Sequence, residues 1–349
     1  MTVERIELRP GYSISRIIKG GWQLAGGHGT FNRSDAINDM IRFIDAGITT
    51  FDCADIYLGV EEMIGEAIQL LRRRDGHSAA DAIEVHTKLV PDLARLDKIT
   101  NTEIEAIIDR SLMRLNLDQL HLVQFYWWDL SIGNPLAALD YLKTLRAKGK
   151  IKYLACTNWD EAAMQPFVDQ HFDLVTAQVQ YSLLDARPAG AFSEWCQSNR
   201  IQILCYGVLA GGFLSDSWLG KNDPGYQFEN RSLIKYRLII KEFGDWTLFQ
   251  KLLTTLAEVG KRHQTGISTI AVAYMLRQPV VAAAIVGART ASHLDQTLSV
   301  FDIQLTDEDL KQITGVLEES DTVSGPVYGL ESDRNSSHGR IMKYNLNST

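Results

Sequence analysis

The stretch "TTFDCADIYLGVEEMIGEAIQLLRRR", residues 49–74, joins one β-strand pattern directly to one helix pattern. Residues 49–54 form a short, mostly apolar run that is typical of a buried strand. Residues 60–74 carry apolar side chains three and four positions apart, which indicates an amphipathic helix. The stretch therefore predicts one strand–loop–helix unit, with Asp52 at the end of the strand and Tyr57 in the loop.

The same alternation recurs along the whole chain. Strand-like runs lie at residues 14–22, 49–54, 82–89, 120–128, 153–158, 174–181, 201–209 and 282–288, with helical patterns between them. Nearly continuous apolar strands joined by helices imply a parallel sheet, and eight such units predict a closed (β/α)8 TIM barrel, with an N-terminal β-hairpin before it. An open doubly wound sheet is the alternative. No GxGxxG follows the first strand, which argues against that alternative.

No linker divides the chain, so residues 1–349 are predicted to form a single domain. Residues 213–246 interrupt the alternation after the seventh strand and are predicted to be a long functional loop. The polar tail, residues 321–349, is expected to lie on the surface over one end of the barrel.

Composition restricts the partners. Hydrophobic residues make up 45% of the chain, enough for a large core, and the net charge of -8 argues against nucleic acid as a partner. No apolar run approaches the roughly 18 residues of a membrane span, and the first residues lack a signal-peptide pattern. The four cysteines have no CxxC spacing, which predicts free buried thiols in a reducing cytoplasm and no structural zinc. The oligomeric state stays open.

Three polar residues stand where the second and third strands end. The second strand ends at Asp52 with Tyr57 five residues later, and the third ends in "HTKL" with Lys88. A lone Asp or Lys is usually a solvated surface charge, but both lie in apolar runs and need a partner there. Neighbouring strands make them partners, and a nearby ammonium would lower the pKa of Tyr57 and suit it to be a general acid.

At these residues the sequence resembles the aldo-keto reductases. The resemblance runs from "KGGWQ" to "DQTL" and is most specific in "FDCADIYLGVEEMIGEAI" and in "TK" at Lys88. It implies an eight-stranded α/β barrel and reduction of an aldehyde or ketone, with NADPH as hydride donor, NADH as the alternative and no metal. Asp52, Tyr57 and Lys88 then fall on catalytic positions, with Tyr57 as the acid.

The resemblance also implies a set of cofactor-binding residues. Thr157, Asn158 and Gln178 would hold the nicotinamide carboxamide, Tyr206 would stack on the ring, and Arg289 would bind the 2′-phosphate. The full set is Gly21, Trp22, Asp52, Thr157, Asn158, Gln178, Tyr206, Gly207, Leu209, Gly211, Gly287, Ala288, Arg289, His293 and Gln296. His293, Gln296 and Thr297 depart from the residues common in the family, so the preference for NADPH rests on Arg289.

The fourth strand carries a further departure, in "LVQFYWWDL" at residues 122–130. The family ends this strand with a catalytic histidine, whereas the aligned residue here is Tyr126. His121 comes five residues too early and is expected to be structural. Neighbouring strand residues point to opposite faces, so one of the two tryptophans should line the substrate pocket while the other packs outside the barrel. The substrate-binding residues are taken to be Trp22, Tyr57, Tyr126 and Trp127.

Three functions are consistent with these patterns. The first is an NADPH-dependent carbonyl reductase with a modified pocket. The second is an NADPH-binding regulatory or sensor protein with weak catalysis, as some relatives become after the histidine is lost. The third is a barrel lyase that uses Lys88 as a Schiff base. Asp52, Tyr57 and Lys88 together favour the first over the second, and the implied cofactor residues argue against the third.

Overall fold

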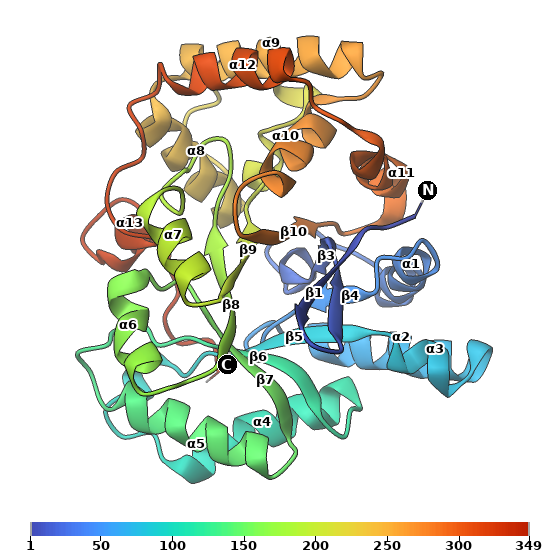
Figure 1. Ribbon diagram of the computed structural model, residues 1–349, viewed down its shortest axis with the longest axis vertical. Helices are drawn as coiled ribbons and strands as arrows, with labels where there is room; N and C mark the ends of the chain where they lie inside the picture. The colour runs from blue at the N-terminus through green and yellow to red at the C-terminus, as the bar shows by residue number, and fades with distance from the viewer. Residues whose placement is uncertain (1, 348–349) are drawn as a thin grey trace.

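Eight parallel strands close into a barrel in the computed structural model, which describes residues 2–347 (Figure 1). They are β3 (Ile17–Gly20), β4 (Thr50–Asp52), β5 (Glu84–Leu89), β6 (Leu120–Phe125), β7 (Ile151–Thr157), β8 (Leu174–Gln180), β9 (Gln202–Tyr206) and β10 (Val281–Gly287). Each strand pairs with the next in the chain, and β10 closes the ring by pairing with both β3 and β9. The predicted barrel is confirmed, and the open doubly wound sheet is wrong.

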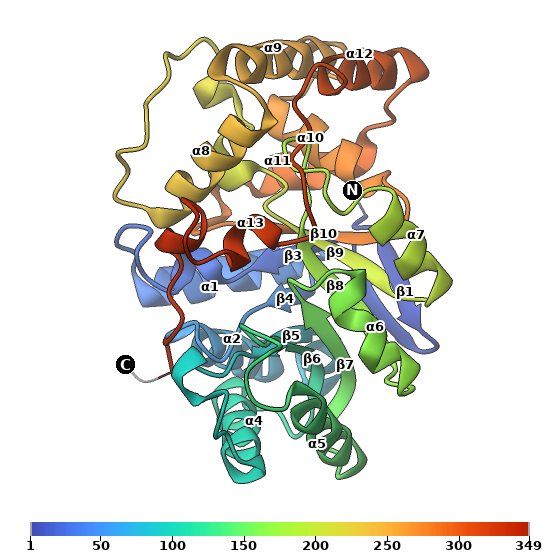
Figure 2. The same ribbon diagram turned by 90° about the vertical axis from the view of Figure 1, so that its left-hand side faces the viewer.

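Helices surround the barrel (Figures 1 and 2). They are α1 (Arg33–Asp45), α2 (Val60–Asp75), α3 (His77–Asp81), α4 (Asn101–Leu115), α5 (Pro135–Ala147), α6 (Glu161–Asp169), α7 (Ala191–Ser198), α8 (Arg231–Phe243), α9 (Trp246–Arg262), α10 (Ile267–Leu276), α11 (Leu294–Leu298), α12 (Asp307–Leu317) and α13 (Gly329–Ser332). Several begin at a polar cap that accepts hydrogen bonds from the first turn: Asn32 caps α1, and Thr100 forms a capping box at α4. Figure 1 shows α9 and α12 side by side, and the two helices are in contact.

The predicted N-terminal hairpin is confirmed. It consists of β1 (Arg5–Arg9) and β2 (Tyr12–Ser15), paired antiparallel. The Tyr12 hydroxyl lies 2.9 Å from Nε2 of His86, and the Tyr12 ring stacks on Tyr153 at 4.4 Å. The hairpin thus closes the end of the barrel where the strands begin, and the opposite end is left for a site.

The first predicted strand, residues 14–22, proves to be parts of two strands. The chain leaves the hairpin at Ser15 and enters the barrel at Ile17. Between them, the main-chain amide of Arg16 donates a hydrogen bond to the Glu4 carbonyl (2.9 Å), and the Ser15 hydroxyl donates to the Ile17 carbonyl (2.7 Å). The apolar run is continuous in the sequence, so its pattern does not reveal this change of partner.

Two predicted loops are more structured than expected. Residues 213–246 include helix α8, which begins after Asn230 because the Asn230 side chain accepts from the Ser232 amide (2.8 Å). The tail runs along the same side of the molecule as α8 and α1 (Figure 2). The tail was expected to lie on the surface, but three of its side chains, Tyr328, Glu331 and His338, are buried. That residues 1–349 form one domain stays a prediction.

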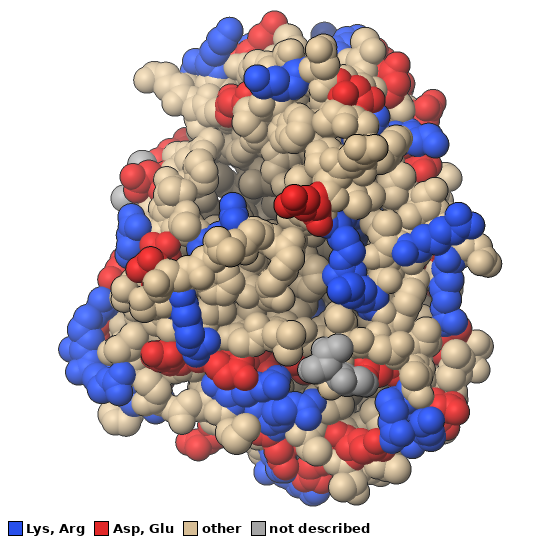
Figure 3. All heavy atoms as spheres, turned by 180° about the vertical axis from the view of Figure 1, so that it is seen from behind, with Lys and Arg blue, Asp and Glu red and all other residues tan. Residues whose placement is uncertain are grey.

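The four cysteines are buried and free, as predicted. Within residues 2–347, none of the helices is both long and apolar enough to span a bilayer. Figure 3 shows basic and acidic side chains interspersed over one face of the molecule.

Two glycines in helices give a matched test of the packing between α2 and α4. A Cβ at Gly65 would lie 2.3 Å from the Arg114 carbonyl oxygen, whereas a Cβ at Gly315 in α12 would meet nothing within 4 Å. We expect Gly65→Ala to lower the free energy of unfolding by about 1–3 kcal/mol, because backbone cannot yield to the methyl group. Gly315→Ala should raise it by about 0.5–1 kcal/mol, because alanine is the better helix former. Urea unfolding of both variants measures these changes, and equal signs would contradict the packing described.

Candidate active site

A cavity of about 1080 Å³ lies where the strands end, and most of the predicted site residues line it. Those on its wall are Trp22, Asp52, Tyr57, Lys88, Tyr126, Thr157, Asn158, Gln178, Tyr206, Gly207, Leu209, Gly211, Gly287, Ala288, Arg289, His293 and Gln296. Gly21 and Trp127 are not on it. A Cβ at Gly21 would meet Val60 at 2.6 Å and the Asp52 carbonyl at 2.9 Å, so this glycine allows β3 to approach β4 rather than a ligand.

The Asp52 carboxylate is the polar centre of this wall. Lys88 Nζ donates to both of its oxygens, at 2.8 and 2.9 Å, and to the Cys53 carbonyl at 2.8 Å. The side-chain amides of Gln124 and Gln178 also donate to Oδ1, at 3.0 and 2.5 Å. One carboxylate therefore receives donors from three other strands, which offsets the cost of burying its charge.

The pKa of Lys88 is raised. Burial lowers it, but the charge of Asp52 and the hydrogen bonds to Asp52 outweigh burial. The side chain therefore remains an ammonium at neutral pH. A Schiff base needs a free amine, so this environment argues against the lyase hypothesis.

Tyr57 lies beside the ion pair, with Lys88 Nζ 5.2 Å from the centre of its ring and the Trp22 ring 5.1 Å away. Lys88 lowers the pKa of Tyr57, as expected, but the expected net lowering is wrong because burial has the larger effect. Burial raises this pKa to about 12; Lys88 lowers it, but Asp52 raises it again. The phenol is thus protonated throughout the neutral range, with a cation beside it to stabilise the phenolate once the proton has left.

Asn158 and Gln178 form an amide pair on the next part of the wall. Asn158 Oδ1 accepts from the Tyr206 hydroxyl (2.8 Å), and Gln178 Nε2 donates to Asp52. The Thr157 hydroxyl donates to the Gln178 main-chain carbonyl (3.0 Å). Within residues 2–347, these contacts leave the Asn158 amide N–H groups and the Gln178 side-chain carbonyl without a hydrogen-bond partner. One donor and one acceptor side by side are complementary to a primary carboxamide.

The glycines after β9 have left-handed backbones, with φ of 73° at Gly207 and 66° at Gly211. A Cβ at Gly207 would lie 2.5 Å from the Tyr236 hydroxyl oxygen, and a Cβ at Gly211 would lie 2.7 Å from a carbon of the Tyr236 ring. These positions therefore need glycine for two reasons, the backbone and the close ring.

The last strand brings Arg289 to the cavity edge. Its NH1 donates to the main-chain carbonyl of His28 (2.6 Å), in the loop after β3. His28 in turn lies 2.6 Å from the Asn230 amide, at the start of α8. Arg289 is exposed, and within residues 2–347 the structure shows no carboxylate paired with it.

The aromatic run after β6 divides as strand alternation predicts. Tyr126 and Trp128 line the cavity with their rings 4.9 Å apart. Trp127 was assigned to the substrate pocket, and this is wrong. Its ring is 2% exposed and packs against Phe125, and its indole donates to the Ile132 carbonyl (2.9 Å). His121 accepts from the Val85 amide (3.0 Å) at the start of β6, in the structural role expected.

The sequence did not reveal the part of the wall that comes from α8 and the tail. Arg231, Ser232, Lys235 and Tyr236 of α8 line the cavity, as does Tyr328 of the tail. The spacing of the α8 residues marks one helix face and could have drawn attention to them. Tyr328 carries no such signal, because the tail has no periodic pattern.

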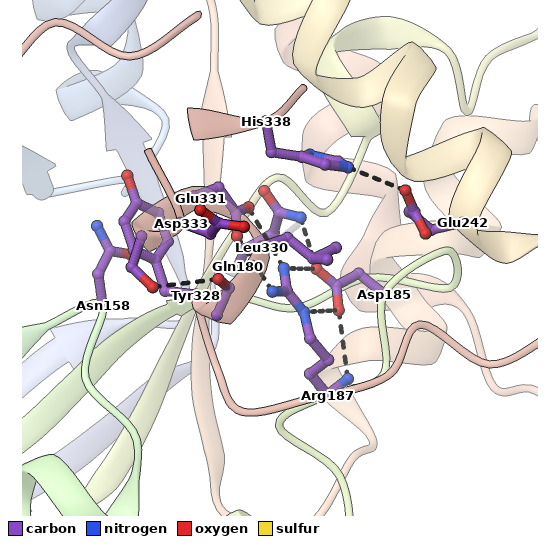
Figure 4. Close-up of polar contacts among 12 residues, drawn as sticks. Asn158, Gln180, Asp185, Arg187, Glu242, Tyr328, Leu330, Glu331, Asp333 and His338 are labelled. Carbon is purple, nitrogen blue, oxygen red and sulfur yellow. Dashed lines mark hydrogen bonds and ion pairs between the residues drawn. The ribbon is translucent and has the colours of Figure 1, made fainter. Parts of the chain in front are cut away.

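A buried group of charges, here named the Glu331 cluster, joins the tail to this wall. It consists of Asp185, Arg187, Lys235 and Glu331. Arg187 bridges the two carboxylates, donating to Asp185 at 2.6 and 2.8 Å and to Glu331 at 3.1 and 3.3 Å (Figure 4). Lys235 Nζ lies 3.5 Å from Glu331 Oε1. Burial raises the pKa of Glu331, but Lys235 and Arg187 lower it to about 2.

Comparison with known proteins agrees with this geometry. The model of the Aldo/keto reductase family matches residues 16–318, so the chain belongs to this family of oxidoreductases. Aldo-keto reductase YhdN of Bacillus subtilis (strain 168) is 28% identical over 91% of this chain and 93% of its own length. NADH-specific methylglyoxal reductase of Escherichia coli (strain K12) is 24% identical over 85% of this chain and 93% of its own.

Solved structures show the same fold. An aldo-keto reductase from Klebsiella pneumoniae, crystallised in complex with NADPH, has a TM-score of 0.68 and 22% identity, covering 93% of this chain and 98% of its own. The thermostable aldo-keto reductase Tm1743 has a TM-score of 0.68 and 24% identity, covering 90% and 99% respectively. The predicted family and fold are confirmed.

Glu331→Gln tests the Glu331 cluster. At pH 7 it should lower the free energy of unfolding by about 3 kcal/mol, because two buried cations lose a counter-charge. The pKa of Glu331 is about 2 when folded and 4.5 as the ordinary value. The carboxylate therefore stabilises the fold fully above pH 4.5, and this advantage disappears as the pH falls toward 2.

Urea unfolding at pH 7 and at pH 3 should show the difference between wild type and Glu331→Gln shrinking at the lower pH. Glu258→Gln, at an exposed position of α9, is the matched control and should change little at either pH. A difference independent of pH would mean that the charge of Glu331 does not stabilise the fold.

Proposed function

We propose that the protein reduces the carbonyl group of an aldehyde or ketone to an alcohol, with NADPH as hydride donor and NADH as the alternative. The observation that carries the proposal is the position of Tyr57, backed by the Asp52–Lys88 ion pair, on the wall of the same cavity as the Asn158–Gln178 amide pair. A proton donor and a carboxamide-complementary pair at one cavity are what reduction by a nicotinamide requires.

The residues present fit a nicotinamide nucleotide. The free donor of Asn158 and the free acceptor of Gln178 would hold the carboxamide, and Tyr206 lies against this pair. The left-handed backbone at Gly207 and Gly211 would lie along the phosphates, and Arg289 would bind a terminal phosphate through paired charge-assisted bonds. When bound, the reduced nicotinamide supplies a hydride to the carbonyl carbon.

The chain's own part is to bind the carbonyl oxygen and protonate it. The Tyr57 hydroxyl donates a hydrogen bond to that oxygen and gives up its proton as the oxygen becomes an alkoxide. An alkoxide is a stronger base than a phenolate, so a phenol whose pKa is about 12 can still deliver its proton. Lys88 stabilises the phenolate left behind, and Asp52 keeps Lys88 charged and in place.

Tyr126 takes the place at which the family carries a histidine. Burial raises the pKa of Tyr126 and the charge of Glu331 raises it further, so its hydroxyl is a neutral hydrogen-bond donor. We infer that it contacts the substrate beside Tyr57 and changes which carbonyl compounds fit.

A spectrophotometric screen of NADPH oxidation with aldehydes, ketones and sugars tests the reductase. Saturable quenching of tryptophan fluorescence by NADPH, without turnover of any compound, would instead favour the regulatory alternative. Absence of both binding and turnover would contradict both functions.

Tyr57→Phe removes only the hydroxyl. Turnover should fall by roughly 100-fold or more, because the alkoxide loses its proton donor, while the Kd for NADPH should be unchanged. Steady-state rates and fluorescence titration measure the two effects. Tyr226→Phe, an exposed tyrosine, is the control and should behave as wild type. Wild-type turnover in Tyr57→Phe would overturn the assignment of the acid.

Arg289→Ala should weaken the binding of NADPH more than the binding of NADH. Only NADPH carries the 2′-phosphate, and loss of a charge-assisted contact to it should cost about 1.5–3 kcal/mol of binding free energy. Titration of each variant with both nucleotides gives the ratio of Kd values. Arg277→Ala, an exposed arginine after α10, should leave the ratio unchanged. Equal weakening of both nucleotides would show that Arg289 does not distinguish them.

A further inference from the structure

The first turns of α8 bring two cations to the cavity. Arg231 and Lys235 are four residues apart, so they lie on one face of the helix, and both line the cavity. Ser232, between them, accepts from the Trp22 indole (3.0 Å), and Trp22 packs against Tyr57. The two cations therefore line the same cavity as the proton donor, with Trp22 between α8 and Tyr57 and with Tyr328 and Ile341 of the tail on the same wall.

The Lys235 ammonium is enclosed by aromatic rings. Its Nζ lies 5.0 Å from the centre of the Tyr206 ring, 5.4 Å from that of Tyr328 and 5.7 Å from that of Tyr236. The side chain of Lys235 is 14% exposed. Ring faces stabilise a cation but accept no strong hydrogen bond, so they leave the N–H groups of the ammonium available.

The only carboxylate paired with Lys235 within residues 2–347 is Glu331, at the long distance of 3.5 Å. Glu331 is already engaged at both oxygens by Arg187. An ammonium has three donors, so Lys235 retains the capacity for a further acceptor. Arg231 donates to the Ile341 carbonyl (3.3 Å), and the described part of the chain provides it with no carboxylate.

Aromatic rings form the wall next to these cations. Trp128 lines the cavity, and its indole nitrogen is buried without an acceptor within residues 2–347. Trp128 packs edge-on against Tyr126, and Tyr126 against Tyr328 at 6.2 Å. The cavity wall thus combines flat aromatic surfaces with two cations that have donor capacity to spare, and a ligand with a flat body and acceptor oxygens matches it.

We propose that the carbonyl substrate carries a carboxylate as well, and that Lys235, assisted by Arg231, binds that carboxylate. This inference rests on the proposed reductase function and specifies its substrate class. Glu331 is a positioning residue here, because it holds the ammonium at the wall from behind without touching the substrate. Charge-assisted contacts to a carboxylate from two cations on one helix face would also orient the substrate relative to Tyr57.

Two other roles for Lys235 are conceivable and give different results. If Lys235 only anchors the tail through Glu331, its removal should affect every substrate alike. If Lys235 contacts a phosphate of the nucleotide, its removal should weaken the binding of NADPH and NADH, whichever substrate is used.

The experiment compares 4-carboxybenzaldehyde with 4-methylbenzaldehyde, which differ in the charged group and share the ring and the aldehyde. kcat and KM are measured for both with wild type, Lys235→Met and Glu331→Gln. Lys241→Met, an exposed lysine on the same helix, is the matched control. Dividing the change in kcat/KM for one aldehyde by the change for the other removes their different intrinsic reactivities.

We expect Lys235→Met to lower kcat/KM for the carboxylated aldehyde roughly 10- to 100-fold more than for the neutral one, mainly through KM. Lys241→Met should leave this ratio as in wild type, and Glu331→Gln should change it less than Lys235→Met does. Equal losses for both aldehydes, or a raised Kd for NADPH and NADH, would overturn the proposal.

Failure of the reductase function gives a separate result. If wild type reduces neither of these aldehydes nor any compound of the wider screen, the proposed function fails, but the anion site is still tested by quenching of tryptophan fluorescence with 4-methylbenzoate. Saturable quenching of wild type, with a Kd for 4-methylbenzoate that rises at least tenfold in Lys235→Met, would support the site. Absence of quenching, or equal quenching in both proteins, would overturn it.

Discussion

The buried ion pair between Asp52 and Lys88 is the interaction on which the rest of the site depends. Both side chains are 6% exposed, so each would be costly to bury alone. The carboxylate is tolerable because donors from Lys88, Gln124 and Gln178 reach it together. Those donors come from β5, β6 and β8, so the full set reaches Asp52 only when these strands have assembled with β4. The fold and the chemistry therefore impose the same requirement on these residues.

Asp52 also connects the proton-donating part of the site with the proposed nicotinamide-binding part, because it accepts from both Lys88 and Gln178. Gln178 gives its N–H to Asp52, and this bond fixes which end of its amide faces the cavity. The Tyr206 hydroxyl fixes Asn158 in the opposite sense, by donating to its oxygen. The result is a donor and an acceptor in set positions, ordered by bonds that already exist in the free protein. Such preorganisation lowers the cost of ordering these groups when a ligand binds.

The sequence predicts best where local pattern and topology agree. Asp52, Tyr57 and Lys88 could be placed together because parallel strands end at one edge, and the active site of such a barrel lies at the C-terminal ends of its strands. Alternation puts Tyr126 and Trp128 on the same side, and Tyr126 was assigned to the pocket, so the pattern favours Trp128 as its neighbour there and the assignment of Trp127 disregarded it. The pKa of Tyr57 could not be predicted, because it depends on how far burial outweighs a neighbouring charge. The contribution of Tyr328 depends on a long-range contact between the tail and Arg187 that no local pattern encodes.

The distribution of charge sets the cavity apart from the rest of this acidic chain. Five cationic and four anionic side chains line it, whereas the whole sequence carries a net charge of -8. Asp52 is neutralised by Lys88, and Asp216 accepts from the first amide of α10 at 3.2 Å. Arg231 and Arg289 have no carboxylate partner within residues 2–347. These two side chains are therefore local positive charges on the cavity wall, and their attraction for an anion would weaken as the ionic strength rises. Such charges suit the anionic nucleotide proposed as the cofactor, and one loop, one helix and the tail supply them together.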